Sequence, residues 1–122
     1  DPPATTKSIR LGAPVFDPPA DPEQLALAHR QLNMRAAYCP AVELGDAPRI
    51  AEIIQAFAKH DLLIAEVGRW KNLLDADPAV RKENLHYVTD GLALADEVGA
   101  RCCVDIAGSY SSESWLPRLS PG

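Results

Sequence analysis

Apolar and polar residues follow two different periods along this chain. Apolar residues at three- and four-residue spacing predict helices over residues 22–32, 47–60 and 78–98. Each of these stretches follows an aspartate and has a proline in its first two positions, which is the sequence signal of a capped helix start. Four short apolar runs predict β-strands over residues 8–15, 35–39, 62–67 and 101–107.

Strands that alternate with amphipathic helices predict an α/β fold with a parallel sheet. Two architectures fit this pattern: a small doubly wound sheet, or the first half of a (βα)8 TIM barrel. Residues 111–122 are polar and irregular, and the fourth strand therefore lacks a following helix, which favours the half-barrel with four strands and three helices. We expect residues 1–122 to be a single partial domain in which residues 1–7 form a flexible lead-in.

Composition and hydropathy argue against a nucleic-acid partner and a membrane partner. The chain has 122 residues and a formal net charge of -5, which argues against a nucleic-acid partner because such partners favour a basic surface. No apolar run reaches the length of a membrane span, so we expect no membrane partner. The three cysteines lack the spacing of a zinc site, and their odd number predicts reduced thiols in a cytoplasmic protein.

Glu66 is the most informative single residue. It lies near the end of the most apolar predicted strand, where burying a carboxylate without a partner would be costly. Because α/β folds present catalytic groups at the carboxyl ends of strands, Glu66 is a candidate general base. Trp70 and Asn72 follow it and could bind a polar ligand, and Asp105 has a similar place in the fourth predicted strand. The alternative is that Glu66 forms a structural ion pair with an arginine and that Trp70 covers the core.

The histidines and glycines predict no other chemistry. His29, His60 and His86 fall in predicted helices or at their ends, which indicates surface or packing roles. Ser109 after Gly108 does not form the G-x-S-x-G motif of a nucleophile elbow. The first predicted strand is followed by neither a dinucleotide-binding glycine motif nor a phosphate-binding loop.

Several short motifs occur in an order that is known from one family. They are Leu11-Gly12, Asp21-Pro22-Glu23, Leu63–Gly68, Trp70, Asn72-Leu73-Leu74, Asp77-Pro78, Gly99-Ala100-Arg101 and Gly108-Ser109-Tyr110. In the order and spacing of these motifs, residues 8–116 resemble the N-terminal half of the xylose isomerase-like TIM-barrel superfamily, the sugar phosphate isomerases and epimerases.

The resemblance implies an enzyme that isomerises or epimerises a small sugar or polyol through an enediolate. In such an enzyme a divalent metal (Mn, Mg, Co or Zn) polarises the substrate oxygens while a carboxylate moves the proton. The metal ligands are expected outside this chain. For this chain, the resemblance implies that Glu66 is catalytic and that the substrate contacts Trp70, Asn72, Ser109 and Tyr110.

Other functions remain open from the sequence. A metal-dependent endonuclease or a dehydratase of the same superfamily is one alternative, although an endonuclease would favour a more basic chain. A non-catalytic half-barrel or binding module is the other. Because a half-barrel would leave apolar strands with open edges, we also expect a homo-oligomer.

Overall fold

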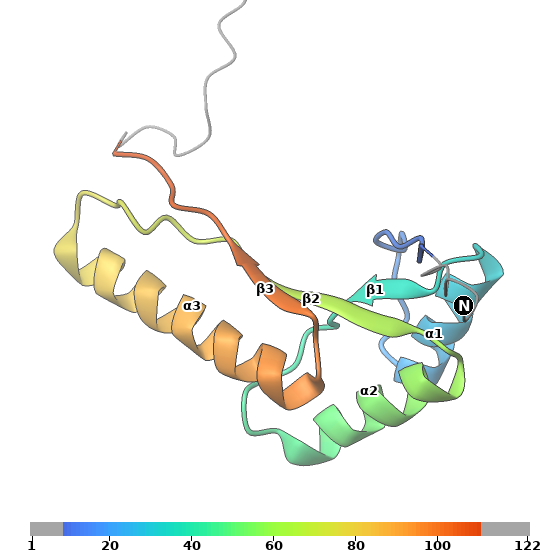
Figure 1. Cartoon of the computed structure of the whole chain (residues 1–122). Helices are drawn as coiled ribbons and strands as arrows, with labels where there is room; N and C mark the ends of the chain where they lie inside the picture. Colours follow the sequence, from blue (N-terminus) through green and yellow to red (C-terminus); the bar gives the residue numbers. More distant parts are fainter. Residues whose placement is uncertain (1–8, 111–122) are drawn as a thin grey trace, which may run out of the picture.

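Three helices and three strands alternate along the part of the chain that the structure describes. The computed structural model describes residues 9–110, and Figure 1 shows their arrangement. The elements in chain order are α1 (Pro22–Gln31), β1 (Ala36–Tyr38), α2 (Ala47–Lys59), β2 (Leu63–Arg69), α3 (Pro78–Val98) and β3 (Cys102–Asp105). The lead-in predicted for residues 1–7 and the tail predicted for residues 111–122 lie outside the described residues.

Each helix begins at its predicted cap. The carboxylates of Asp21, Asp46 and Asp77 accept hydrogen bonds from backbone N–H groups of the first turns at 2.9, 3.3 and 2.8 Å. A cap of this kind stabilises a helix by about 1 kcal/mol. α3 ends at Gly99, whose φ of 71° lies in the left-handed region that glycine adopts without strain. The three predicted helices are therefore confirmed, and none of those described has the length and apolarity to cross a membrane.

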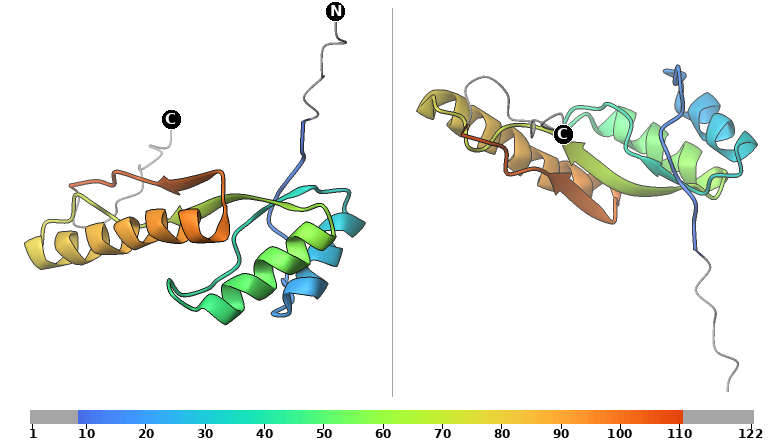
Figure 2. Two further views of the ribbon diagram at one scale, coloured as in Figure 1. Left: turned by 60° about the horizontal axis from the view of Figure 1, so that its bottom comes forward. Right: turned by 90° about the horizontal axis from the view of Figure 1, so that it is seen from above.

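The three strands form one parallel sheet with the order β1-β2-β3. Ala37 pairs with Ile64 and Val67 pairs with Cys103, and the register of β1 against β2 shifts just after Ala37. All three helices lie on one side of this sheet (Figure 2). Within residues 9–110, the opposite face carries no helix and β3 pairs with β2 alone. This arrangement leaves one sheet face and one strand edge uncovered by the described residues.

The core lies between the sheet and the helices. The largest fully buried side chains are Phe57, Ile53 and Leu94, which come from α2 and α3. They belong to one cluster with Ile64 and Val67 of β2. Burying a side chain as large as that of Phe57 stabilises the fold by about 2–3 kcal/mol. The apolar spacing of α2 thus correctly predicted its buried side at Ile53 and Phe57.

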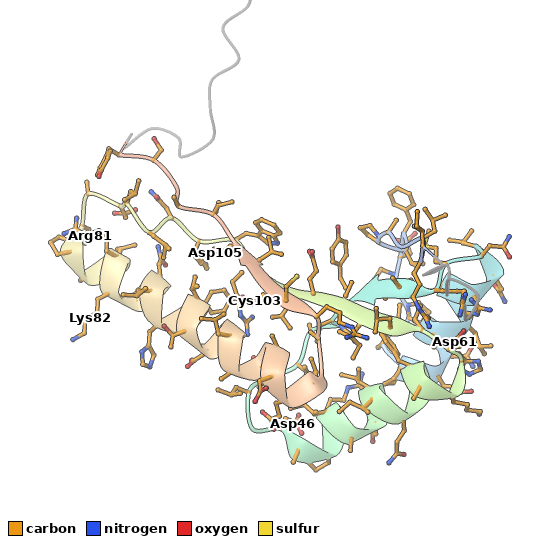
Figure 3. All side chains as sticks on the ribbon, viewed as in Figure 1. Asp46, Asp61, Arg81, Lys82, Cys103 and Asp105 are labelled. Atoms are coloured by element: carbon orange, nitrogen blue, oxygen red, sulfur yellow. The ribbon has the colours of Figure 1, made fainter. Side chains whose placement is uncertain are left out.

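An exposed ion-pair cluster joins the segment before α1 to the amino-terminal end of the sheet. The carboxylate of Asp61, which Figure 3 labels, accepts hydrogen bonds from Arg35 and Arg10. These bonds from Arg35 and Arg10 lower the pKa of Asp61 below its usual value. Arg10 also donates to the backbone oxygens of Arg35 and Asp61 at 3.1 and 3.0 Å. The cluster therefore anchors the segment around Arg10 without making it a strand.

The predicted first strand and the predicted half TIM barrel are wrong. Residues 9–15 meet the sheet at a single bridge, which is formed by Gly12. Pro14 lacks the N–H group that a strand ladder needs. The side chains of Ile9 and Leu11 are 96% and 66% exposed, so two of the four apolar side chains expected on one face of this strand are not buried against residues 9–110. The described fold is instead a small α/β unit with a three-stranded parallel sheet and three helices.

Candidate functional site

Glu66 lies in β2 on the sheet face that carries no helix. The next residue, Val67, is 3% exposed and packs in the core, so the alternation of a strand turns Glu66 to the other face. In register, Glu66 lies beside Tyr38 of β1 and Cys102 of β3, which are both exposed. Within residues 9–110, no hydrogen bond or ion pair joins its carboxylate to another side chain. This half-buried carboxylate is therefore open to a ligand.

A hollow of about 230 Å³ adjoins Glu66. Its walls come from the segment before α1 and from the first two strands, and they include Tyr38 and Ala65. Arg10 also lines the hollow, but its guanidinium is bound to Asp61 and to backbone oxygens. Arg10 therefore pairs with Asp61 and not with Glu66, as the alternative role of Glu66 would have required of an arginine.

Trp70 lies over Gly68 and borders the same surface. A Cβ atom added to Gly68 would lie 2.7 Å from the indole Nε1 of Trp70, so the ring occupies the space that glycine leaves. Gly68 and Glu66 are two residues apart in β2 and therefore share a face. The side chain of Trp70 is 52% exposed. An aromatic ring and a carboxylate thus border one exposed face near the carboxyl end of β2.

The side chain of Asn72 is bound to backbone groups of its own chain. It is 9% exposed. Its Nδ2 donates to the backbone oxygen of Ser109 at 3.0 Å, and its Oδ1 accepts from the N–H groups of Ser109 and Leu74 at 3.0 and 3.1 Å. Its own backbone oxygen accepts from Nδ2 of Asn84 at 2.8 Å. These bonds, which we call the Asn72 clamp, join the loop after β2 to the loop after β3.

The loop after β3 is shaped by the Asn72 clamp. Gly108 has a φ of 98°, and a Cβ atom added there would lie 1.8 Å from Oδ1 of Asn72, so this position requires glycine. Ser109 is half-buried, whereas Tyr110 is 81% exposed. Of the five residues predicted for the site, the structure joins Asn72 to Ser109 and places Glu66 and Trp70 on one face. Tyr110 lies beyond the clamp at the end of the described residues.

Asp105 and Arg69 lie on the sheet face that carries the helices. They are in register with each other, and each lies three residues beyond the row of Glu66 and Cys102, which turns them to the opposite face. The guanidinium carbon of Arg69 is 4.3 Å from the ring centroid of Tyr87 in α3, and its Nη1 donates to the Tyr87 hydroxyl at 3.0 Å. Figure 3 labels Asp105 on β3. The two strand carboxylates, Glu66 and Asp105, therefore do not converge on one site.

Two residues that pack against side chains of β2, one on each face of the sheet, were not identified from the sequence. Tyr38 ends β1 beside Glu66, and an aromatic residue at the end of a neighbouring predicted strand was the available signal. Gly91 lies in the interior of α3, where a Cβ atom would be 2.3 Å from Cγ of Arg69. Because glycine is about 1 kcal/mol less favourable than alanine inside a helix, its presence there was a signal of close packing.

The described residues do not form a metal centre. Within residues 9–110, no group of three or more histidine, cysteine, aspartate or glutamate side chains is placed to hold a metal ion. The three cysteines there are free thiols. Burial raises the pKa of the Cys39 thiol to about 11, against a smaller lowering by Arg69. Cys39 is therefore a neutral thiol near pH 7 and not an activated nucleophile.

Comparison with known proteins gives one informative structural likeness. No family model matches this chain, and no curated protein matches it. The apo crystal structure of the 3-keto-D-glucoside 4-epimerase YcjR from E. coli is similar, with a TM-score of 0.62 and 15% sequence identity. The match covers 81% of this chain and 37% of that chain. The likeness shows that the α/β arrangement described here also occurs as part of an epimerase, and this chain spans just over a third of the length of that protein.

Proposed function

We propose that this chain supplies part of the substrate site of a carbohydrate epimerase or isomerase. The observation that carries the proposal is the placement of Glu66 and Trp70 on one uncovered sheet face near the carboxyl end of β2. An exposed indole can pack against the C–H face of a sugar ring, while a carboxylate can accept a hydrogen bond or a proton from it. The similar fold of a 3-keto-D-glucoside 4-epimerase supports the same class of reaction.

Glu66 acts as the base in the proposed reaction. Its carboxylate takes the proton from the carbon next to the carbonyl group of the substrate, and the electron pair of the broken C–H bond moves toward the carbonyl oxygen to form an enediolate. Return of a proton to the other face of that carbon completes an epimerisation. Tyr38, which lies beside Glu66 in register, can donate a hydrogen bond to a substrate oxygen.

The negative charge of the enediolate oxygen requires a stabilising partner. Tyr38 can donate one hydrogen bond, but Arg10 is bound to Asp61 and Arg69 lies on the other sheet face, so neither arginine supplies a free positive charge. We propose, in line with the family resemblance, that a divalent metal (Mn, Mg, Co or Zn) would supply this stabilisation and that its ligands lie outside this chain.

Carbohydrate binding without catalysis is the second candidate function. It is favoured by the engagement of Arg10, the cation that lines the hollow beside Glu66, with Asp61. Binding would use the ring of Trp70 and the carboxylate of Glu66 in the same contacts. The two functions differ in whether a C–H bond of the sugar is broken.

Hydrogen exchange on a keto sugar tests the proposal. The whole protein that contains this chain, supplied with Mn²⁺ and incubated with a 3-keto-D-glucoside in D₂O, should introduce deuterium at the carbon next to the carbonyl group, which NMR detects. Glu66→Gln keeps the shape of the side chain and removes the base, so it should slow this exchange at least about tenfold, which corresponds to about 1.4 kcal/mol of transition-state stabilisation. Glu97→Gln, at an exposed position of α3, is the matched control.

The outcomes of this experiment separate the two functions. Exchange that is lost in Glu66→Gln and kept in Glu97→Gln supports the enzyme. Saturable sugar binding that is lost in Trp70→Ala, with no exchange even in the unmodified protein, supports the binding role. Equal exchange rates in the unmodified protein and in Glu66→Gln would show that Glu66 is not the base.

A further inference from the structure

A second cavity, of about 380 Å³, shares Tyr38 with the hollow beside Glu66. It is bounded by the segment before α1, by the start of α1 and by the loop after β1. Its walls are mainly apolar and include Pro14, Val15, Pro19, Leu25, Pro40 and Ala41. This size falls within the range of small-molecule sites, which are typically about 300–1,000 Å³ and mostly apolar with a few polar groups.

His29 supplies the polar group that distinguishes this cavity from a simple packing defect. Its side chain lines the cavity and is only 4% exposed. Its Nδ1 is 2.8 Å from the backbone oxygen of Leu25, so Nδ1 donates and the neutral ring carries an acceptor at Nε2. Nε2 has no hydrogen-bond partner in residues 9–110. Within these residues, Arg69 Nε is the one side-chain nitrogen or oxygen that is both fully buried and unpartnered, so Nε2 is not fully buried. The lone pair of Nε2 is therefore presented to the cavity.

Tyr38 also lines the cavity with its hydroxyl, and the other two polar side chains of the wall are already engaged. Arg49 donates through Nη1 to Glu52 at 3.0 Å and through Nη2 to the backbone oxygen of Ala20. The thiol of Cys39 donates to the backbone oxygen of Pro40 at 3.3 Å. The cavity therefore offers a ligand a mainly apolar wall, the acceptor of His29 and the hydroxyl of Tyr38, and the charge of Arg49 is already paired.

We propose that this cavity binds a small uncharged molecule, mainly apolar, that donates one hydrogen bond to Nε2 of His29. An aromatic alcohol is the simplest chemical class with these properties, because its ring fills an apolar cavity and its hydroxyl supplies the donor. An apolar ligand would take Nε2 out of contact with water without replacing its hydrogen bond, so a ligand that donates to Nε2 gains over an isosteric hydrocarbon. The site shares Tyr38 with the hollow beside Glu66, but its ligand contact at His29 does not use Glu66 or Trp70.

Three matched probes test the chemical class. Titration of the protein with p-cresol, followed by NMR shifts of the His29 ring, should show saturable binding. Toluene, which has the same ring and methyl group without the hydroxyl, should bind at least about tenfold more weakly, and p-toluate should bind more weakly still because its charge finds no free partner. Absence of saturable p-cresol binding would overturn the proposal. Toluene or p-toluate binding as tightly as p-cresol would also overturn it.

Matched variants test the location. His29→Phe keeps an aromatic ring and removes the acceptor, so it should reduce p-cresol binding to the level of toluene. Ala41→Trp places a large side chain at an exposed position of the cavity wall and should block all three probes, and it keeps the test valid if His29→Phe does not fold. Ala58→Trp, at an exposed position of α2 outside the cavity, is the control and should bind p-cresol normally. Unchanged binding in Ala41→Trp would place the ligand elsewhere and overturn the proposal, whatever the outcome of the exchange experiment on Glu66.

Discussion

Replacing Asn72 with alanine should loosen the two loops that the Asn72 clamp joins. The substitution removes three hydrogen bonds of the amide side chain, two with Ser109 and one with Leu74, all at a partly buried site. Each intramolecular hydrogen bond contributes about 1 kcal/mol, and a buried backbone group left unpaired costs more. We therefore expect Asn72→Ala to lower the free energy of unfolding by about 2–3 kcal/mol.

Thermal unfolding followed by circular dichroism measures this loss. In a domain of about 100 residues, 1 kcal/mol shifts the melting temperature by about 4–8 °C, so Asn72→Ala should melt about 10 °C or more below the unmodified protein. Asn72→Asp should also be destabilised, because a carboxylate oxygen would replace the donor that now faces the backbone oxygen of Ser109. Gln55→Ala removes an exposed amide from α2 and should melt within about 2 °C of the unmodified protein.

Gly108→Ala tests the geometry of the same clamp. The added methyl group would lie 1.8 Å from Oδ1 of Asn72, so part of its cost comes from that collision. In the double variant with Asn72→Ala the collision is removed, and the combined loss should be smaller than the sum of the single losses by about 0.5–3 kcal/mol. Strictly additive losses, or a melting temperature for Asn72→Ala equal to that of Gln55→Ala, would refute the clamp.

Three further predictions concern other contacts. Two arginine contacts hold the pKa of Asp61 below its reference value of 3.8, so Asp61→Asn should lower the melting temperature at pH 7. The difference in melting temperature between the variant and the unmodified protein should shrink as pH falls through the lowered pKa, and a difference that does not change with pH would contradict this. Gly91→Ala should lower the free energy of unfolding in urea by about 1–3 kcal/mol because the methyl group collides with Arg69. In a protein that already carries Arg69→Ala, adding Gly91→Ala should instead raise the free energy of unfolding, because alanine favours a helix more than glycine does. Iodoacetamide at pH 8 should label Cys102 well before Cys39, whose pKa of about 11 keeps it protonated, and equal rates in peptide mass spectrometry would argue against this.

Local signals in the sequence were sufficient to predict the helices and most of the strands. Asp21 opens α1 and Gly99 ends α3, because a cap and a positive φ depend on residues within one turn. The three strands fall within or next to the predicted apolar runs, since apolar side chains must be buried wherever the chain places them. Glu66 and Trp70 could be named as candidates for a related reason: a carboxylate and an aromatic ring at the end of an apolar run stand out from it.

Only the tertiary structure decided which side chains meet. Residues 9–15 have the alternation of a strand but form one bridge, to Ala36 of β1, because the pairing of a strand depends on how the segment meets residues that are distant in the chain. Asn72 meets Ser109 across 37 positions, a contact that no short stretch of sequence encodes. Glu66 and Arg69 are three residues apart, yet one faces the uncovered side of the sheet and the other contacts α3, because the elements that pack around β2 determine which of its faces is buried.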